Sequence, residues 1–174
     1  MEKIRLRALT TEDAKITWLW QNSPEIKEFY SDHPYPVNFE MEKLWYEKIT
    51  YTNIPVTVFG IEILENHKLI GMSILKNINL IHRSAELGIF IGDTSEKHKG
   101  YSGEATRLTL KFGFLDMGLN RIYLKVHEDN TPALKLYEKN GFKKEGLLRK
   151  SVFKNGRFKN EIIMSLLKEE FKPV

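Results

Sequence analysis

The chain contains no cysteine in 174 residues. This absence excludes disulfide bonds, thiolate catalysis and cysteine-based metal sites, and it is typical of proteins from a reducing compartment. No hydrophobic run approaches the length of a membrane span. The N-terminal residues alternate like a strand and lack the apolar core of a signal peptide. We therefore expect a cytoplasmic protein that does not cross a membrane.

A focused basic surface is also lacking. The net charge is +4, but the 27 lysines and arginines are scattered among 23 acidic residues. A basic run with interleaved aromatic residues occurs only near the C-terminus, at Arg149–Lys154. Nucleic-acid-binding proteins usually concentrate their positive charge on one face, so nucleic acid is not the expected partner. A modest positive balance suits a small anionic ligand instead.

The length, with 41% hydrophobic and 29% charged residues, predicts a single domain over residues 1–174 with a sizeable core. Hydrophobic periodicity predicts strands at 4–9, 55–64, 68–75, 84–92, 120–126, 142–153 and 158–166, and helices at 11–21, 23–31, 39–49, 103–117 and 131–140. Asn155-Gly156 is the strongest hairpin signal, and Thr131 is expected to cap the last helix, with Pro132 at its first position. The fold class expected is α+β, with a central, mostly antiparallel sheet flanked by helices.

The segment Lys97–Ala105 is the most informative part of the chain. It follows an apolar strand pattern and opens a helical one. The free N–H groups of such a turn and the dipole of the following helix attract anions, and Lys97, His98 and Lys99 add positive charge. The segment predicts a phosphate or pyrophosphate site. The alternative is an ordinary connection with solvated lysines.

Glu86 stands in the middle of the apolar strand pattern 84–92. Alternation places Glu86 on one face of the strand with Gly88 and Phe90. A carboxylate buried among apolar groups is a candidate general base. A salt bridge to Arg83 or to a neighbouring strand is the alternative, and the sequence leaves both open.

Asn130 and Tyr137 are separated by roughly two turns of one helix. Asn130 can offer its amide, and Tyr137 its phenol O–H, to a ligand near the start of that helix. The alternative is that Asn130 caps the helix and Tyr137 packs in the core.

Together these segments resemble the GNAT superfamily of acetyl-CoA-dependent N-acetyltransferases, in the RimJ/RimL-like subgroup that includes ribosomal-protein N-terminal and spermidine acetyltransferases. The resemblance covers essentially the whole chain and is carried by the segments 4–7, 78–87, 119–124, 130–142 and 155–157. One departure lies in the turn, which usually reads Gln/Arg-x-x-Gly-x-Gly/Ala. Here Lys97 and Ser102 replace the first and last residues, while Gly100 is kept.

The resemblance implies that acetyl-CoA lies beside strand 84–92, with its pantetheine amides paired to the backbone there and its pyrophosphate on the N–H groups of Lys99 to Glu104. Asn130 would contact the pantetheine or nucleotide arm. No metal is implied. The coenzyme-binding residues expected on this basis are Ile89, Phe90, Ile91, Lys97, Lys99, Gly100, Tyr101, Ser102, Gly103, Glu104 and Asn130.

The resemblance also implies direct attack of a primary amine on the thioester in a ternary complex. Glu86 would take a proton from the amine, directly or through water. Tyr137 would protonate the leaving thiolate, and a backbone N–H of a bulged strand would stabilise the oxyanion.

The acceptor site is expected in the N-terminal third, at residues 25–35 and the helix after Phe39, and at the hairpin tip near Asn155. Lys76 and Asn77 stand where the polyamine enzymes carry acidic residues, which argues against spermidine. A protein N-terminus or a small-molecule amine is the main expectation. A polyamine acceptor and a non-catalytic acyl-CoA-binding module are the alternatives. Relatives are often dimers, so a homodimer is expected. Five acidic residues of this region could attract a cationic amine, namely Glu25, Glu28, Asp32, Glu40 and Glu42. We expect most of them to lie on a solvated helix face.

Overall fold

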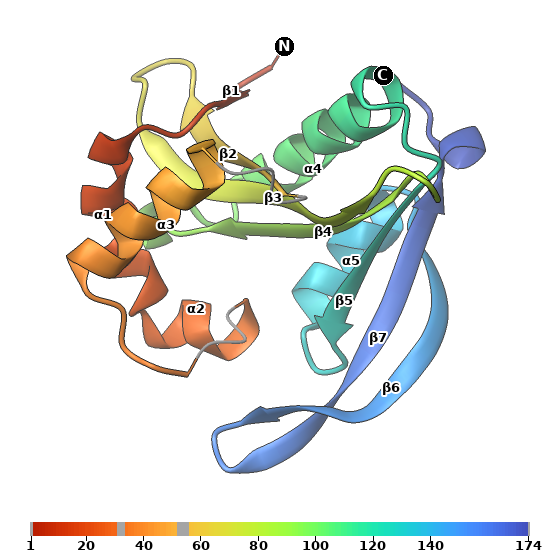
Figure 1. Ribbon diagram of the computed structural model, residues 1–174. Coiled ribbons are helices and arrows are strands. Elements are labelled where there is room, and N and C mark those ends of the chain that lie inside the picture. Colours follow the sequence, from red (N-terminus) through yellow and green to blue (C-terminus); the bar gives the residue numbers. More distant parts are fainter. Residues whose placement is uncertain (1, 31–33, 52–55, 174) are drawn as a thin grey trace.

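A mixed β-sheet forms the centre of the structure (Figure 1), a computed structural model that describes residues 2–30, 34–51 and 56–173. Within these residues the strand order is β1-β2-β3-β4-β5-β7-β6. Strands β4 and β5 are parallel, and every other neighbouring pair is antiparallel. The strands are β1 (Ile4–Arg7), β2 (Thr57–Ile63), β3 (Leu69–Asn79), β4 (Ser84–Ile91), β5 (Arg121–His127), β6 (Lys143–Lys154) and β7 (Arg157–Leu167). The predicted fold class and the predominantly antiparallel sheet are confirmed.

The helices agree with the predicted positions within a few residues. They are α1 (Ala14–Gln21), α2 (Pro24–Phe29), α3 (Phe39–Tyr51), α4 (Tyr101–Lys111) and α5 (Thr131–Lys139). The predicted helix 103–117 begins two residues earlier and ends in a π-helical turn at Phe112–Asp116. The predicted cap at Thr131 is wrong. Asn130 is the N-cap of α5, and its side-chain oxygen accepts a hydrogen bond from the Ala133 N–H at 3.2 Å.

Helices α4 and α5 cover one face of the sheet. The inward side chains of β4 and β5, such as Leu87 and Leu124, join Leu110 and Phe114 of the α4 region in one large apolar core. Gly113 lets this segment approach the sheet closely, because a Cβ there would lie 2.6 Å from Ile122. Dense packing of this kind fixes the position of α4 relative to β4.

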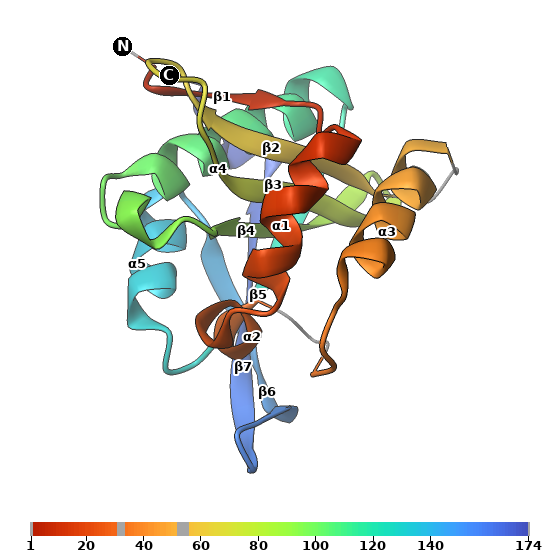
Figure 2. The same ribbon diagram turned by 90° about the vertical axis from the view of Figure 1, so that its left-hand side faces the viewer.

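Helices α1, α2 and α3 lie on the opposite face (Figures 1 and 2). The apolar cluster there is smaller and contains Trp20, Ile26 and Phe90. It is accompanied by buried polar contacts, including the bond from the Thr17 hydroxyl to the Glu42 carboxylate at 2.6 Å. The backbone of Gly92 packs under Trp20, where a Cβ would overlap the indole.

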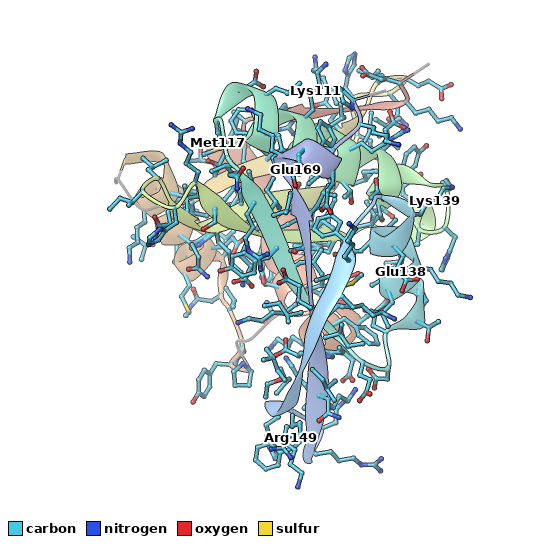
Figure 3. All side chains as sticks on the ribbon, turned by 90° about the vertical axis from the view of Figure 1, so that its right-hand side faces the viewer. Lys111, Met117, Glu138, Lys139, Arg149 and Glu169 are labelled. Carbon is cyan, nitrogen blue, oxygen red and sulfur yellow. The ribbon has the colours of Figure 1, made fainter. Side chains whose placement is uncertain are left out.

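The hairpin of β6 and β7 turns at Asn155 and Gly156, both with positive φ as a tight hairpin turn requires. Its far end projects beyond the rest of the sheet (Figure 1). Figure 3 shows Arg149 near that far end and Glu169 near the opposite end of the hairpin. The tip reaches α2, where Asn155 hydrogen-bonds to Glu28. A segment late in the sequence thus braces a helix of the N-terminal third.

Candidate active site

The two central parallel strands separate soon after they meet. β4 pairs with β5 at three positions, Ser84 with Arg121, Ala85 with Ile122, and Glu86 with Tyr123. Beyond Glu86, β4 pairs with β3 alone as far as Ile91, and β5 pairs with β7 alone. Strand β4 therefore presents an unpaired edge along its second half, which includes the predicted residues Ile89, Phe90 and Ile91. An extended chain carrying amides can pair with such an edge.

The predicted bulge in β4 is wrong. The register of β4 with β3 is continuous from Gly71 opposite Ile91 to Lys76 opposite Glu86, and the irregularity lies in β3, between Lys76 and Asn79. Divergence of β5, and not a bulge, is what frees the backbone N–H groups of β4.

The turn before α4 has the geometry of an anion site. Gly100 has a φ of 87° and precedes the first residue of α4. This left-handed conformation favours glycine. The N–H groups of Gly103 and Glu104 donate to the Gly100 carbonyl at 3.1 and 3.3 Å. Those of Tyr101 and Ser102, in the first turn of α4, have no intrahelical acceptor and are left for a ligand.

The basic side chains of this turn are already paired with carboxylates. Lys97 Nζ lies 2.5 Å from Glu25 Oε1 of α2, and Lys99 Nζ lies 2.8 Å from Glu96 Oε2. The hydrogen bond to Glu96 raises the pKa of Lys99. Glu104 faces the other way, and its carboxylate accepts from the Lys3 N–H at 2.7 Å. A bound phosphate would compete for the lysines with their present partners.

Tyr137 lies in α5, in the apolar core that also contains Leu87 of β4 and Leu124 of β5. It is 5% exposed, and its ring packs edge-on against Phe142 at 5.6 Å. Its hydroxyl makes no hydrogen bond with any residue that the structure describes. Burial raises the pKa of Tyr137, and the charge that Tyr30 would carry raises it further. The phenol is therefore a neutral group with a proton to donate.

The end of α2 bridges the two diverging strands. The ring of Phe29 lies 6.0 Å from His127 at the end of β5, and the ring of Tyr30 lies 5.7 Å from Phe90 of β4. Lys159 of β7 stands over Phe29 at 5.9 Å. The aromatic pair Phe29 and Tyr30 thus lies against both diverging strands, on the side of α1 to α3.

Glu86 lies on this same side, as alternation predicts, and is 6% exposed. Its carboxylate is 3.4 Å from Lys76 Nζ and accepts a hydrogen bond from Asn77 Nδ2 at 2.9 Å. The salt bridge to a neighbouring strand, left open by the sequence, is therefore present, with β3 as the partner. Lys76 and Asn77 both donate to this carboxylate. If Glu86 accepts a proton from the substrate, it does so while paired with Lys76.

The acidic residues of the N-terminal third are less solvated than expected. Glu42 is buried at 3% exposure, and Glu28 forms an ion pair with Lys159 at 2.5 Å. Glu40 stands on an exposed helix face, as expected, and Asp32 lies outside the described residues. Sequence reasoning missed Phe29, Tyr30 and His127. The segment 25–35, expected to form the acceptor site, contains Phe29 and Tyr30, whereas nothing in the sequence singled out His127.

Comparisons with known proteins agree with this geometry. Residues 3–143 match the family of acetyltransferase (GNAT) domains. The chain is 33% identical over 169 residues to a spermidine N(1)-acetyltransferase of Vibrio cholerae, covering 97% of this chain and 95% of that one. It is 30% identical over 172 residues to an uncharacterized N-acetyltransferase, p20, of Bacillus licheniformis, covering 98% and 96%. A crystal structure of the Vibrio cholerae spermidine N-acetyltransferase with CoA and spermine superposes with a TM-score of 0.90 at 32% identity, covering 97% of each chain.

The chain belongs to the GNAT family of acetyltransferases. It is an enzyme that transfers an acetyl group from acetyl-CoA to an amine nitrogen. In the described residues, no helix is both long and apolar enough to span a membrane, and no cluster of metal-ligating side chains is found.

Proposed function

We propose that this chain is a RimJ/RimL-like, cytoplasmic enzyme that acetylates the primary amine of a small molecule or a peptide N-terminus by direct attack in a ternary complex. We propose a homodimer as its assembly. The observation that carries the reaction is the buried Tyr137, which senses Tyr30 next to Phe90 of β4, together with the unpaired edge of that strand. The Tyr137 hydroxyl can protonate the leaving thiolate, while the edge of β4 binds the pantetheine arm that carries the thioester.

The coenzyme would lie along β4 and end at the turn before α4. Its pantetheine amides would pair with the backbone of Ile89, Phe90 and Ile91, and its pyrophosphate would occupy the N–H groups of Tyr101 and Ser102. The side-chain oxygen of Asn130 caps α5, which leaves the Asn130 amide N–H₂ to donate to the pantetheine arm. Lys97 and Lys99 would exchange a carboxylate for phosphate.

The proton steps divide between two residues. When the amine attacks the thioester carbon, the negative charge on the carbonyl oxygen is stabilised by a free N–H of β4. The carbon–sulfur bond then breaks, and Tyr137 gives its proton to the sulfur. The same burial that keeps the phenol protonated also disfavours a free thiolate, so proton transfer accompanies bond cleavage.

Glu86 would take the proton from the attacking amine through water. A free primary amine has a pKa of about 10 and is mostly protonated at neutral pH. We expect Glu86→Gln to lower kcat/KM most at pH values where the amine is protonated, and least in alkaline solution. A pH–rate profile measured beside the control Glu65→Gln, an exposed turn residue, tests this. An unaltered profile would assign the proton to another base.

A polyamine is the second candidate acceptor, and two observations favour it. Spermidine acetyltransferases match the chain over almost its whole length, and the carboxylates of Glu28 and Asp129 lie near the opening, both paired to Lys159. Lys76, on the same side of the sheet, opposes a polycation. A small-molecule monoamine or peptide N-terminus therefore remains the main proposal.

A panel of acceptors tests the proposed function. Purified protein and acetyl-CoA are incubated separately with spermidine, a Ser-starting peptide, glucosamine and kanamycin, and free thiol is measured. Turnover of the peptide or glucosamine above spermidine supports the main proposal, and the reverse order supports the polyamine. No thiol release with any of them, despite acetyl-CoA binding by calorimetry, would contradict both.

A further inference from the structure

His127 is the last residue of β5, at the open end of the separation from β4. Ile122, Leu124 and Val126 point into the core beneath α4 and α5. Alternation therefore directs His127 to the opposite side, where Glu86 and its register partner Tyr123 also point. This is the side from which an acceptor would approach.

The imidazole packs on α2, next to ion pairs that join α2, β7 and the turn after β5. Phe29 of α2 packs on it at 6.0 Å. Glu28 of α2 is near enough for His127 to affect its charge, although Lys159 is the main cause of the lowered pKa of Glu28. Lys159 of β7 holds both Glu28 and Asp129, at 2.5 and 3.0 Å. The carboxylates that could accept from the imidazole are thus already engaged.

One atom of this ring lacks a partner. His127 is 6% exposed, and its Nδ1 is buried without a hydrogen bond to any of the described residues. It is also the one buried side-chain polar atom in that state across the part of the chain that the structure describes. Leaving such an atom unpaired is costly, and native proteins satisfy nearly all of them. A ligand at the opening would supply the missing partner.

We propose that His127 is an acceptor-binding residue, whose Nδ1 accepts a hydrogen bond from an N–H of the amine substrate. Phe29 holds the ring in place, and the substrate is held between His127 on β5 and Phe90 on β4. The inference rests on the proposed function, because it requires an amine acceptor. It adds a contact to the N–H of the acceptor.

Two substitutions at this position separate binding from packing. His127→Phe fills the space but removes the acceptor atom, and we expect the KM for the acceptor to rise about tenfold, as loss of one substrate hydrogen bond predicts. His127→Asn places its side-chain oxygen near the position of Nδ1, and we expect it to restore most of the affinity. The KM for acetyl-CoA stays unchanged in both.

The control is His67→Asn, at an exposed histidine in the turn between β2 and β3. The assay uses each amine of the panel that the wild-type enzyme acetylates, and thermal unfolding with CoA checks that each variant is folded. If His127→Phe and His127→Asn raise the acceptor KM equally, or leave it unchanged, the proposal is wrong while the acetyltransferase reaction stands.

An NMR titration tests the contact between His127 and the amine without any need for turnover. Protein labelled with ¹⁵N-histidine and saturated with CoA is titrated with spermidine, the Ser-starting peptide and glucosamine. We expect one of them to shift the Nδ1 resonance of His127, assigned by its loss in His127→Asn. A resonance that none of the three amines moves overturns the proposal. If the resonance moves but no amine is acetylated, the proposed function fails and the binding role of His127 remains.

Discussion

The two faces of the sheet are built by different means. The face under α4 and α5 is a continuous apolar core, with Phe114 and Leu110 at or below 1% exposure. The face under α1 to α3 has a small apolar cluster around Ile26 and Phe90. Polar pairs also link its elements to the rest of the structure, such as Glu25 with Lys97 and Glu28 with Lys159.

This difference separates the two tasks of the enzyme. Helix α4, which follows the coenzyme turn, and Tyr137 contribute to the closely packed side, where the dense core fixes their position. The candidate acceptor site belongs to the side held by ion pairs, and exposed ion pairs contribute little to stability.

The largest effect should come from opening a cavity in the closely packed face. We expect Phe114→Ala to reduce the free energy of unfolding by about 3–5 kcal/mol, because the cavity cannot collapse in a dense core. Ile26→Ala, in the small cluster, should cost about 2 kcal/mol, the lower end of its range. Urea unfolding of both variants measures the difference. A loss in Ile26→Ala as large as that in Phe114→Ala would contradict the expected order.

Removal of the Tyr137 hydroxyl should have the next largest effect, and it should appear in catalysis alone. We expect Tyr137→Phe to lower kcat at least about tenfold, roughly 1.4 kcal/mol of transition-state stabilisation. Acetyl-CoA affinity, measured by calorimetry, should not change, because the ring and its contact with Phe142 remain. The matched control is Tyr123→Phe on β5. Unchanged kcat in Tyr137→Phe would remove this residue from the mechanism.

The smallest effect concerns the buried Glu42 beneath α1. Burial raises the pKa of Glu42, and the hydrogen bond from Thr17 partly opposes this shift. When the pKa of a carboxyl is higher in the folded than in the unfolded state, the folded protein loses stability as the pH rises through the folded-state pKa. We therefore expect Glu42→Gln to match the wild type in stability near pH 4 and to exceed it near pH 7. Thermal unfolding at both values checks the sign, and a difference independent of pH would contradict it.

The sequence was sufficient for the fold because its signals were local. Alternation in β4 correctly assigned Glu86 and Phe90 to one face, and Asn155-Gly156 correctly placed the hairpin turn. Thr131 was a wrong choice of cap, because Asn130 and Thr131 are both good N-cap residues and stand side by side. Which of them caps depends on the backbone before the helix, and composition does not encode that directly.

The acceptor side was harder to predict because its contacts join distant segments. Glu28 accepts hydrogen bonds from Asn155 and Lys159, which lie more than 120 residues away in the sequence. No local sequence pattern predicts such contacts. Lys76 reaches Glu86 only because β3 and β4 pair in a particular register. The missing partner of His127 Nδ1 could not be found from sequence, since it depends on every group around the ring.

The brief parallel pairing of β4 with β5 has a mechanical consequence. The sheet halves β1–β4 and β5–β7 are joined by a seam of three residue positions. A coenzyme seated beyond that seam would link the two halves, because it would pair with the backbone of β4 and accept a hydrogen bond from Asn130, which follows β5. Ligand that binds only the folded form stabilises it by mass action. Amide hydrogens on both sides of the seam should therefore exchange more slowly with solvent once the coenzyme is bound.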